Sequence, residues 1–382
     1  MSDLIQILPL WKALHASNTE YVLATVVEVE GSGYRKPGAR MIVAADGRRA
    51  GTISGGCLEA EVARKAFWHT ENGPVMRRYS TSPDDGDVPF GMGCGGVVHV
   101  LLERSRTAGP LLERLSAAFT ARQPLAVSTI IEGDAIGQRA FYPADDTPRG
   151  TPKLQDLAQH AFAKSRSFSA NIEVEDRQIA AVRSEWIAAR PGLFIFGAGD
   201  DALPLVTLAN QLGWHTAVAD GRAHLVTVAR FPLADDLHPL PQRTTLPISF
   251  RPTDAAVIMT HSLQQDTHIL AHLLQQNLAY LGVLGPRHRT REMLITIAQQ
   301  MSTGVDSTTA AHDAQIEDWF TRLHAPMGLD LGGNAPADIA LAIIAEIQQT
   351  LHHASGQALR QLRASSASCA PIAIESRRTS AS

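Results

Sequence analysis

The chain has 382 residues, of which 45% are hydrophobic and 19% are charged, a composition typical of a folded protein with enough apolar surface for two hydrophobic cores. Lys and Arg number 34 against 38 Asp and Glu, and this net charge of -4 does not favour binding to nucleic acid or to an anionic membrane. Because only 3 cysteines are present, a disulfide framework of the secreted kind is excluded.

Neither a secretory signal nor a membrane span is visible in the sequence. The first residues lack a basic region followed by a long apolar stretch, and no segment reaches the roughly 20 apolar residues that a bilayer requires. We therefore expect a cytoplasmic protein.

The first 190 residues show the pattern of an α+β domain. Clustered apolar residues over 4–14 predict a helix, and β-rich runs bounded by Gly, Pro or Asp follow. The predicted strands are 21–29, 41–45, 50–53, 76–79, 97–103, 126–131 and 138–142, with further strands leading to 187. The predicted helices are 58–68, 110–121 and 153–164.

A second domain is predicted from Pro191. Apolar strands at 193–196, 216–219, 255–259 and 280–284 alternate with helical stretches such as 268–276, which is typical of a parallel, doubly wound sheet. Asn334 is expected to cap a last helix that has Pro336 in its first turn and runs towards His352. The predicted fold class is α/β, with domains at 1–190 and 191–354 and a disordered tail at 355–382.

The turn after 193–196 has the glycine spacing of a nucleotide-binding loop. Gly197 would permit the tight turn and Gly199 a close approach to pyrophosphate, and Asp220 lies where a ribose-binding carboxylate is expected. However, Asp200 and Asp201 place two negative charges where the pyrophosphate would lie. A working nucleotide site and a Rossmann scaffold without a bound dinucleotide therefore both remain open. In the same domain, His261 and Ser262 follow a strand and should lie at the edge of the sheet where ligands bind.

Two cysteines lie in glycine-rich loops. Cys57 follows Gly55 and Gly56, and Cys94 stands between Gly93 and Gly95. Glycines open the backbone around a sulfur to a bulky ligand, and a helix that begins near Cys57 would lower the pKa of its thiol, which suits a transition metal or sulfur transfer. The alternative is a pair of small buried apolar residues. The spacing of ligands required for structural zinc is absent, and redox pairing of the two cysteines stays open.

A basic, glycine-rich loop occupies 31–40. Arg35, Lys36 and Arg40 could hold a phosphate together with backbone N–H groups. The alternative is a solvated basic turn.

Taken together, these motifs resemble the XdhC/CoxI family. The resemblance rests on GSGYRKPGAR, GTISGGCLEAEV and GMGCGG in the first half and on FGAGDDALPL, MTHS and MGLDLGG in the second, and it spans residues 4–350. It implies an N-terminal XdhC/CoxI domain followed by a Rossmann-like domain, commonly in a homodimer.

The resemblance also implies a function, that of a cytoplasmic maturation factor without turnover of its own. Such a factor binds the molybdenum cofactor, supports its sulfuration with a cysteine desulfurase, and delivers it to an apo molybdenum hydroxylase such as xanthine dehydrogenase. Applied to this sequence, Arg35, Lys36 and Arg40 would meet the cofactor phosphate, the glycine-rich loops would admit the pterin, and Cys57 or Cys94 would lie near molybdenum.

Two other functions remain in competition. One is an NAD(P)-dependent oxidoreductase that uses Gly197, Gly199 and Asp220. The other gives the second domain a regulatory role, in which a bound nucleotide controls release of the cofactor from the first domain.

Overall fold

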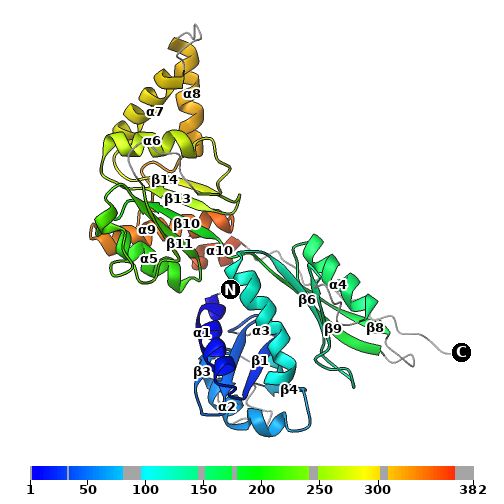
Figure 1. Ribbon diagram of the computed structural model, residues 1–382. Coiled ribbons are helices and arrows are strands. Elements are labelled where there is room, and N and C mark those ends of the chain that lie inside the picture. Colours follow the sequence, from blue (N-terminus) through cyan, green and yellow to red (C-terminus); the bar gives the residue numbers. More distant parts are fainter. Residues whose placement is uncertain are drawn as a thin grey trace, which may run out of the picture. The chain divides into compact units, whose positions relative to one another are not determined.

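A computed structural model of the protein describes residues 2–31, 34–80, 96–144, 151–173, 179–240, 248–301 and 309–365. These residues form two compact units, the first built mainly from 1–194 and the second from 239 onwards together with 195–205 and 219–225. Two antiparallel sheets and one parallel sheet make up the described fold (Figure 1).

The first sheet has the strand order β3-β2-β1-β5-β4 and is antiparallel throughout. Its strands are β1 (Tyr21–Glu30), β2 (Arg40–Ala44), β3 (Arg49–Gly51), β4 (Val75–Ser80) and β5 (Val97–Arg104), and the helices around it are α1 (Ser2–Ala16), α2 (Cys57–His69) and α3 (Ser105–Thr120).

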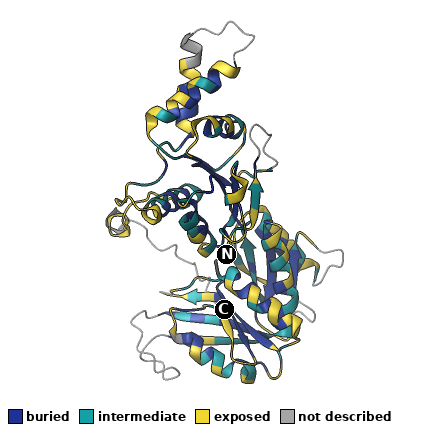
Figure 2. Ribbon diagram, turned by 60° about the vertical axis from the view of Figure 1, so that its left-hand side comes forward, coloured by how far each residue is buried: buried dark blue, intermediate teal, exposed yellow. Residues whose placement is uncertain are grey.

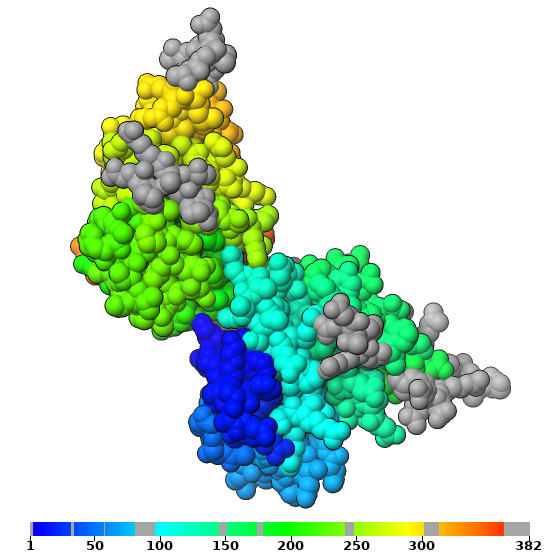
Figure 3. All heavy atoms as spheres, viewed as in Figure 1, coloured from blue at the N-terminus to red at the C-terminus, as the bar shows by residue number. Residues whose placement is uncertain are grey.

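The central strand β1 is buried on both faces because helices cover both sides of its sheet. Tyr21 and Leu23 pack into a core with α1 and α3, whereas Val22, Ala24 and Val26 pack into a separate core with α2. This division follows from the alternation of side chains along a strand. Figure 2 shows the buried strands against helices whose outer faces are exposed, and Figure 3 shows α1 on the surface beside α3.

The second sheet has the order β7-β6-β9-β8 and is also antiparallel. Its elements are β6 (Leu125–Ile130), β7 (Arg139–Tyr142), α4 (Pro152–Ala163), β8 (Phe168–Glu173) and β9 (Ile179–Ile187). One face packs on α4, while the other shares the core of α1 and α3, so that α3 contributes to the packing of both sheets. The segment expected to form a single domain with the first residues thus contains a sheet of its own.

The parallel sheet has the order β12-β11-β10-β13-β14. Its elements are β10 (Gly192–Phe196), α5 (Ala202–Gln211), β11 (His215–Asp220), β12 (Asp236–Pro239), β13 (Ala255–Ile258), α6 (Leu263–Leu273), β14 (Tyr280–Val283), α7 (Arg287–Met301), α8 (Thr309–Arg322) and α9 (Pro336–Leu351). In chain order this is the 3-2-1-4-5 arrangement of a doubly wound fold, in which the direction of winding reverses between β10 and β13. The predicted α/β class and parallel sheet are confirmed.

Several predicted boundaries are wrong. Helix α3 begins at Ser105 and contains Pro110 inside it, whereas proline was expected at its start. Helix α9 takes Ala335 as its N-cap in place of Asn334, and Asp338 accepts the hydrogen bond from the Ala335 N–H. A short helix, α10 (Leu359–Ser365), lies within the segment expected to be disordered, and 366–382 fall outside the described residues.

No helix in the described part of the chain combines the length and the apolar composition needed to cross a membrane.

Gly197 provides a test of the junction between β10 and β13. Its φ is 136°, and a Cβ there would overlap the carbonyl oxygen of Met259, so we expect Gly197→Ala to lower the free energy of unfolding by about 2–4 kcal/mol. Gly47→Ala is the matched control, because Gly47 also has positive φ, 88°, but open space around it. Its cost should be limited to about 1–2 kcal/mol. Urea unfolding of both variants measures the difference, and equal costs would show that the Met259 contact does not matter.

Candidate functional site

The basic loop at 31–40 and the glycine-rich loop that precedes Cys57 lie next to each other. The ring of Tyr34 lies over Gly55, where a Cβ would be 3.7 Å from the ring atoms. Tyr34 itself is 80% exposed, so its other face is open to solvent. The basic loop and the loop that precedes Cys57 therefore form one continuous surface.

Cys57 is the first residue of α2, as the sequence suggested. The residue before it, Gly56, is the N-cap and has a φ of 117°, a left-handed conformation that favours glycine. The backbone of Cys57 therefore stands at the positive end of the helix dipole. Gly93, Cys94 and Gly95 lie outside the described residues.

A buried carboxylate holds this loop in place. Glu59 is 4% exposed and accepts hydrogen bonds from the backbone N–H groups of Ile53 at 3.0 Å and Ser54 at 2.8 Å, and from the Ser54 hydroxyl at 2.6 Å. Ser54 Oγ in turn accepts from the N–H groups of Gly56 and Leu58. Ser54 and Glu59 thus satisfy the N–H groups of Ile53, Ser54 and Gly56 in the loop and one free donor in the first turn of α2, the Leu58 N–H.

These hydrogen bonds also set the protonation of Glu59. Burial by itself raises the pKa of this carboxyl group, but the hydrogen bonds from Ser54 and the backbone outweigh burial and hold the pKa below its ordinary value. Glu59 is therefore ionised at neutral pH.

An open pocket of about 520 Å³ adjoins the basic loop. Its lining includes Tyr34, Arg35 and Lys36 from the loop, Asp3 from α1, and Trp186 from β9. Arg35 forms an ion pair with Asp3. Lys36 is exposed, and no ion-pair partner for it is found among the described residues. The pocket therefore combines aromatic side chains with a lysine available to an anion.

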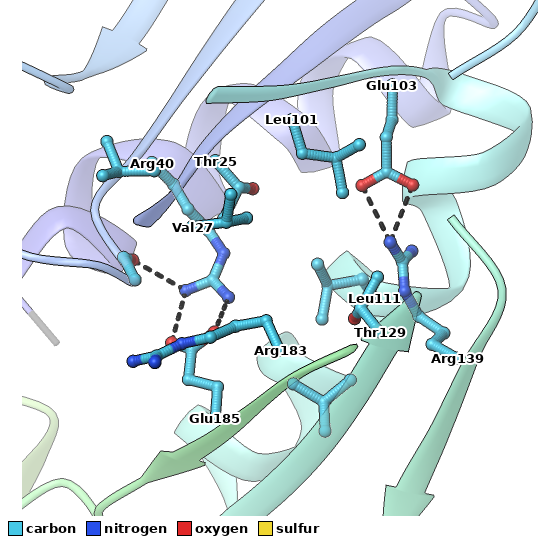
Figure 4. Close-up of a pocket in the computed structure, with 13 residues that line it drawn as sticks. Thr25, Val27, Arg40, Leu101, Glu103, Leu111, Thr129, Arg139, Arg183 and Glu185 are labelled. Atoms are coloured by element: carbon cyan, nitrogen blue, oxygen red, sulfur yellow. Dashed lines mark hydrogen bonds and ion pairs between the residues drawn. The ribbon is translucent and has the colours of Figure 1, made fainter. Parts of the chain in front are cut away.

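The third cation predicted to bind phosphate, Arg40, is engaged inside the protein. Its guanidinium donates to the Gly38 carbonyl at 2.9 Å and to Glu185 Oε1 at 3.1 Å, and a second hydrogen bond joins it to Glu185 Oε2 (Figure 4). Gly38 has a φ of 99°, which favours glycine, and a Cβ there would lie 2.8 Å from Glu185 Oε1, so the Glu185 side chain would have to shift. Arg40 therefore forms part of the pocket wall with its charge already paired.

At the edge of the parallel sheet, Asp220 is also engaged. Its side chain is fully buried, and it accepts from the Ala198 N–H at 2.7 Å and from the Arg222 backbone and guanidinium at 2.8–3.1 Å. Burial raises its pKa, but the bonds from Arg222 and Ala198 outweigh burial and lower the pKa overall. The carboxylate expected to bind ribose is thus used to tie the glycine-rich loop to Arg222.

The same edge holds a histidine-carboxylate pair. His261 Nε2 lies 2.9 Å from Asp201 Oδ2, and the His261 side chain is 60% exposed. Its φ of 65° is unusual for a residue other than glycine. A Cβ on Gly199 would lie 2.6 Å from Asp201 Oδ1, so this glycine leaves room for the protein's own carboxylate where a pyrophosphate would approach.

Within the described ranges, no group of three or more His, Cys, Asp or Glu side chains is arranged to hold a metal ion.

Comparison with known proteins identifies the family. Residues 14–80 match the model of the XdhC and CoxI family, and residues 193–347 match the XdhC Rossmann domain. The chain is 31% identical over 351 residues to a Bacillus subtilis protein named as a probable subunit of xanthine dehydrogenase, covering 88% of this chain and 95% of that protein. The chain belongs to the XdhC and CoxI family.

Two further relatives extend this finding. The Escherichia coli molybdenum cofactor insertion chaperone PaoD is 25% identical over 335 residues, covering 87% of this chain and 84% of PaoD. A crystal structure described as a xanthine dehydrogenase from Bacillus halodurans has a TM-score of 0.69 and 29% identity, and the match covers 92% of this chain and 96% of that one. The XdhC/CoxI resemblance and the Rossmann-type domain inferred from the motifs are confirmed.

Some residues of these sites are far away in the sequence and could not be predicted from it. Trp186 and Glu185 lie about 150 positions from the basic loop, and no local pattern marks them. No local pattern predicts the pairing of Asp201 with His261 either, because 60 positions separate them in the chain.

Glu59 provides a test of how the loop before Cys57 is held. We expect Glu59→Gln to lower the free energy of unfolding by about 1–3 kcal/mol, because a buried network of hydrogen bonds to a charged acceptor is weakened. Since the pKa of Glu59 is lowered in the folded state, its ionisation stabilises the protein above the unfolded pKa, and this contribution is lost as pH falls through the folded pKa. The difference between parent and variant should therefore shrink below about pH 4.5.

Glu61→Gln is the matched control for this experiment. Glu61 is on the same helix but pairs with Arg64 and Lys65 at the surface, so its replacement should cost less than about 0.5 kcal/mol. Urea unfolding between pH 4 and 7 measures both variants, and equal effects would contradict the role given to Glu59.

The engagement of Asp220 and Asp201 predicts weak binding of nicotinamide nucleotides. We expect millimolar NADH or NADPH to shift the thermal unfolding midpoint by less than about 1 °C, with a dinucleotide-binding dehydrogenase as positive control. A dissociation constant below about 0.1 mM by calorimetric titration would contradict this prediction and favour the oxidoreductase or nucleotide-regulated alternative.

Proposed function

We propose that this protein is a molybdenum cofactor-binding chaperone that supports sulfuration of the cofactor and its insertion into a molybdenum hydroxylase of the xanthine dehydrogenase type. The observation that carries the proposal is the contact of Tyr34 with Gly55, which joins the basic loop, its pocket and the start of α2 into one surface. The relatives named as an insertion chaperone and as a probable xanthine dehydrogenase component support the assignment.

The residues of this surface fit the chemistry of the cofactor, a pterin dithiolene with a terminal phosphate. Lys36 offers an exposed ammonium group for the phosphate, with Arg35 beside it in the pocket. The open volume and the exposed Tyr34 ring suit a flat heterocycle. Cys57 and Cys94 are the proposed neighbours of molybdenum. When bound, the cofactor supplies the metal centre on which the recipient enzyme depends.

In this proposal the chain binds and shields its cargo without turnover of its own. Lys36 holds the phosphate beside the Arg35–Asp3 ion pair, the glycines at 55 and 56 let the cofactor approach the backbone, and Ser54 with Glu59 keeps that backbone in position. A cysteine desulfurase would supply the sulfur, and the apo hydroxylase would receive the cofactor. Function as a homodimer in the cytoplasm is part of the same proposal.

Anaerobic gel filtration with released molybdenum cofactor tests the proposal. The parent protein should elute with about one molybdenum and one pterin per chain, and Cys57→Ala or Cys94→Ala should reduce molybdenum retention about tenfold or more, because a soft thiolate ligand is lost. Cys369→Ala is the matched control, since it removes the third cysteine outside both glycine-rich motifs.

The contrary results are equally clear. If a folded parent protein releases all cofactor on the column, the chaperone function is wrong. If all three cysteine variants retain molybdenum as the parent does, cofactor binding stands but the cysteines are not its neighbours.

A further inference from the structure

A small cavity of about 20 Å³ lies between the first and second sheets (Figure 4). Residues of β1, β2, β5 and α3 line one side, and residues of β6, β7 and β9 line the other. This space holds one water-sized or chloride-sized particle and is too small for phosphate or for the cofactor.

Two buried ion pairs flank the cavity. Glu103, which is fully buried, receives Arg139 Nη2 at 2.7 Å on each of its carboxylate oxygens. Arg40 pairs with Glu185 on the opposite side (Figure 4). A third guanidinium, that of Arg183, also lines the cavity. The lining therefore contains three guanidinium groups against two carboxylates.

Burial and neighbouring carboxylates both act on the pKa of Arg183. Burial lowers the pKa of Arg183, while Glu185 and the exposed Glu28 act in the opposite direction. Arg183 also donates to the Ser169 hydroxyl at 3.3 Å in an exposed contact, so its charge is partly solvated, while Arg40 and Arg139 are matched one to one by Glu185 and Glu103.

Three polar atoms in the lining lack a hydrogen-bond partner among the described residues. They are Arg40 Nε, Arg139 Nε and Thr25 Oγ1. Their residues are 5%, 7% and 6% exposed, so bulk water does not satisfy them. Buried polar groups without partners are costly, and three beside one small cavity indicate that something inside it accepts their hydrogen bonds.

We propose that this cavity binds a single small monovalent anion of chloride size. All three unsatisfied groups are able to donate, and the two guanidinium Nε–H groups can only donate, so a small anion, which accepts without donating, satisfies them together. A water molecule accepts two hydrogen bonds and brings two donors of its own, whereas an anion accepts from all three groups.

The site has a consequence for the pocket described above. Gly38, Arg40 and Glu185 line both the cavity and the open pocket. A bound anion would thus strengthen the contact between β2 and β9 from within, and the inference does not depend on what the open pocket binds.

Thermal unfolding of the full chain at constant ionic strength tests the proposal. Sodium chloride and sodium bromide should raise the unfolding midpoint by about 2–4 °C relative to sodium gluconate, with saturation. Thr25→Val, which keeps the shape and removes the hydroxyl, should lose at least about half of this shift. Thr296→Val, which removes a hydroxyl from α7 in the second unit, should keep the full shift.

The other outcomes overturn the proposal. If chloride and gluconate give the same midpoint and Thr25→Val lowers it equally in both, the cavity holds water. If the midpoints agree and Thr25→Val raises them, the cavity is empty. Crystals grown with bromide give a direct check, because the anomalous signal should show one bromide between Arg40 and Arg139, and its absence there contradicts an anion site.

Discussion

Buried charge pairing is the constraint on which the first unit depends. The two sheets are joined by Arg40 with Glu185 and by Glu103 with Arg139, and each of these four side chains has little or no access to solvent. An unpaired charge at such depth would be strongly destabilising, so the partners must come together whenever the sheets do. The pairs therefore help to specify how β2 faces β9 and how β5 faces β7. Because Arg40 and Glu185 also line the basic pocket, their pairing positions its walls.

The parallel sheet shows a different use of charge. A doubly wound fold normally offers an anion the N-terminus of its first helix and a free carboxylate after its second strand. Here Asp201 lies at the first position and Asp220 binds the glycine-rich loop, so that both features serve the protein itself. The doubly wound fold is retained, but the groups that usually contact a ligand bind other residues of the protein. His261, held by Asp201 in an uncommon backbone conformation, is an exposed group at this edge.

Much of the fold could be predicted from local pattern, and the exceptions have physical reasons. Strand β1 was predictable because its apolar run is bounded by turn residues, and α2 because its periodic face ends near His69. The start of α3 was missed because Pro110 was assumed to mark the first turn, although tertiary packing of Ala108, Leu111 and Leu112 extends the helix on both sides of it. Helices α7 and α8 and the short strand β12 were not predicted, although Met293, Leu294, Ile297 and Ala298 give α7 a helical apolar period; β12 has no apolar run to mark it. For the candidate site, Tyr34 to Arg40 and the glycines before Cys57 were found from composition. The hydrogen-bond partners of Arg40 and Asp220 could not be predicted, because hydrogen bonds between distant segments leave no local signal in the sequence.

The sequence separation of the Arg40–Glu185 pair, 145 residues, has a bearing on biosynthesis. One side of the basic pocket is made as the first 40 residues emerge from the ribosome, but the other side, from Glu185 to Ala188, emerges only after the whole second sheet has been translated. Closing so long a loop is slow compared with local hairpin formation. The pocket therefore has no finished wall on the nascent chain until almost half of the protein has been synthesised, and a ligand that contacts both walls can bind only after the second sheet has been made.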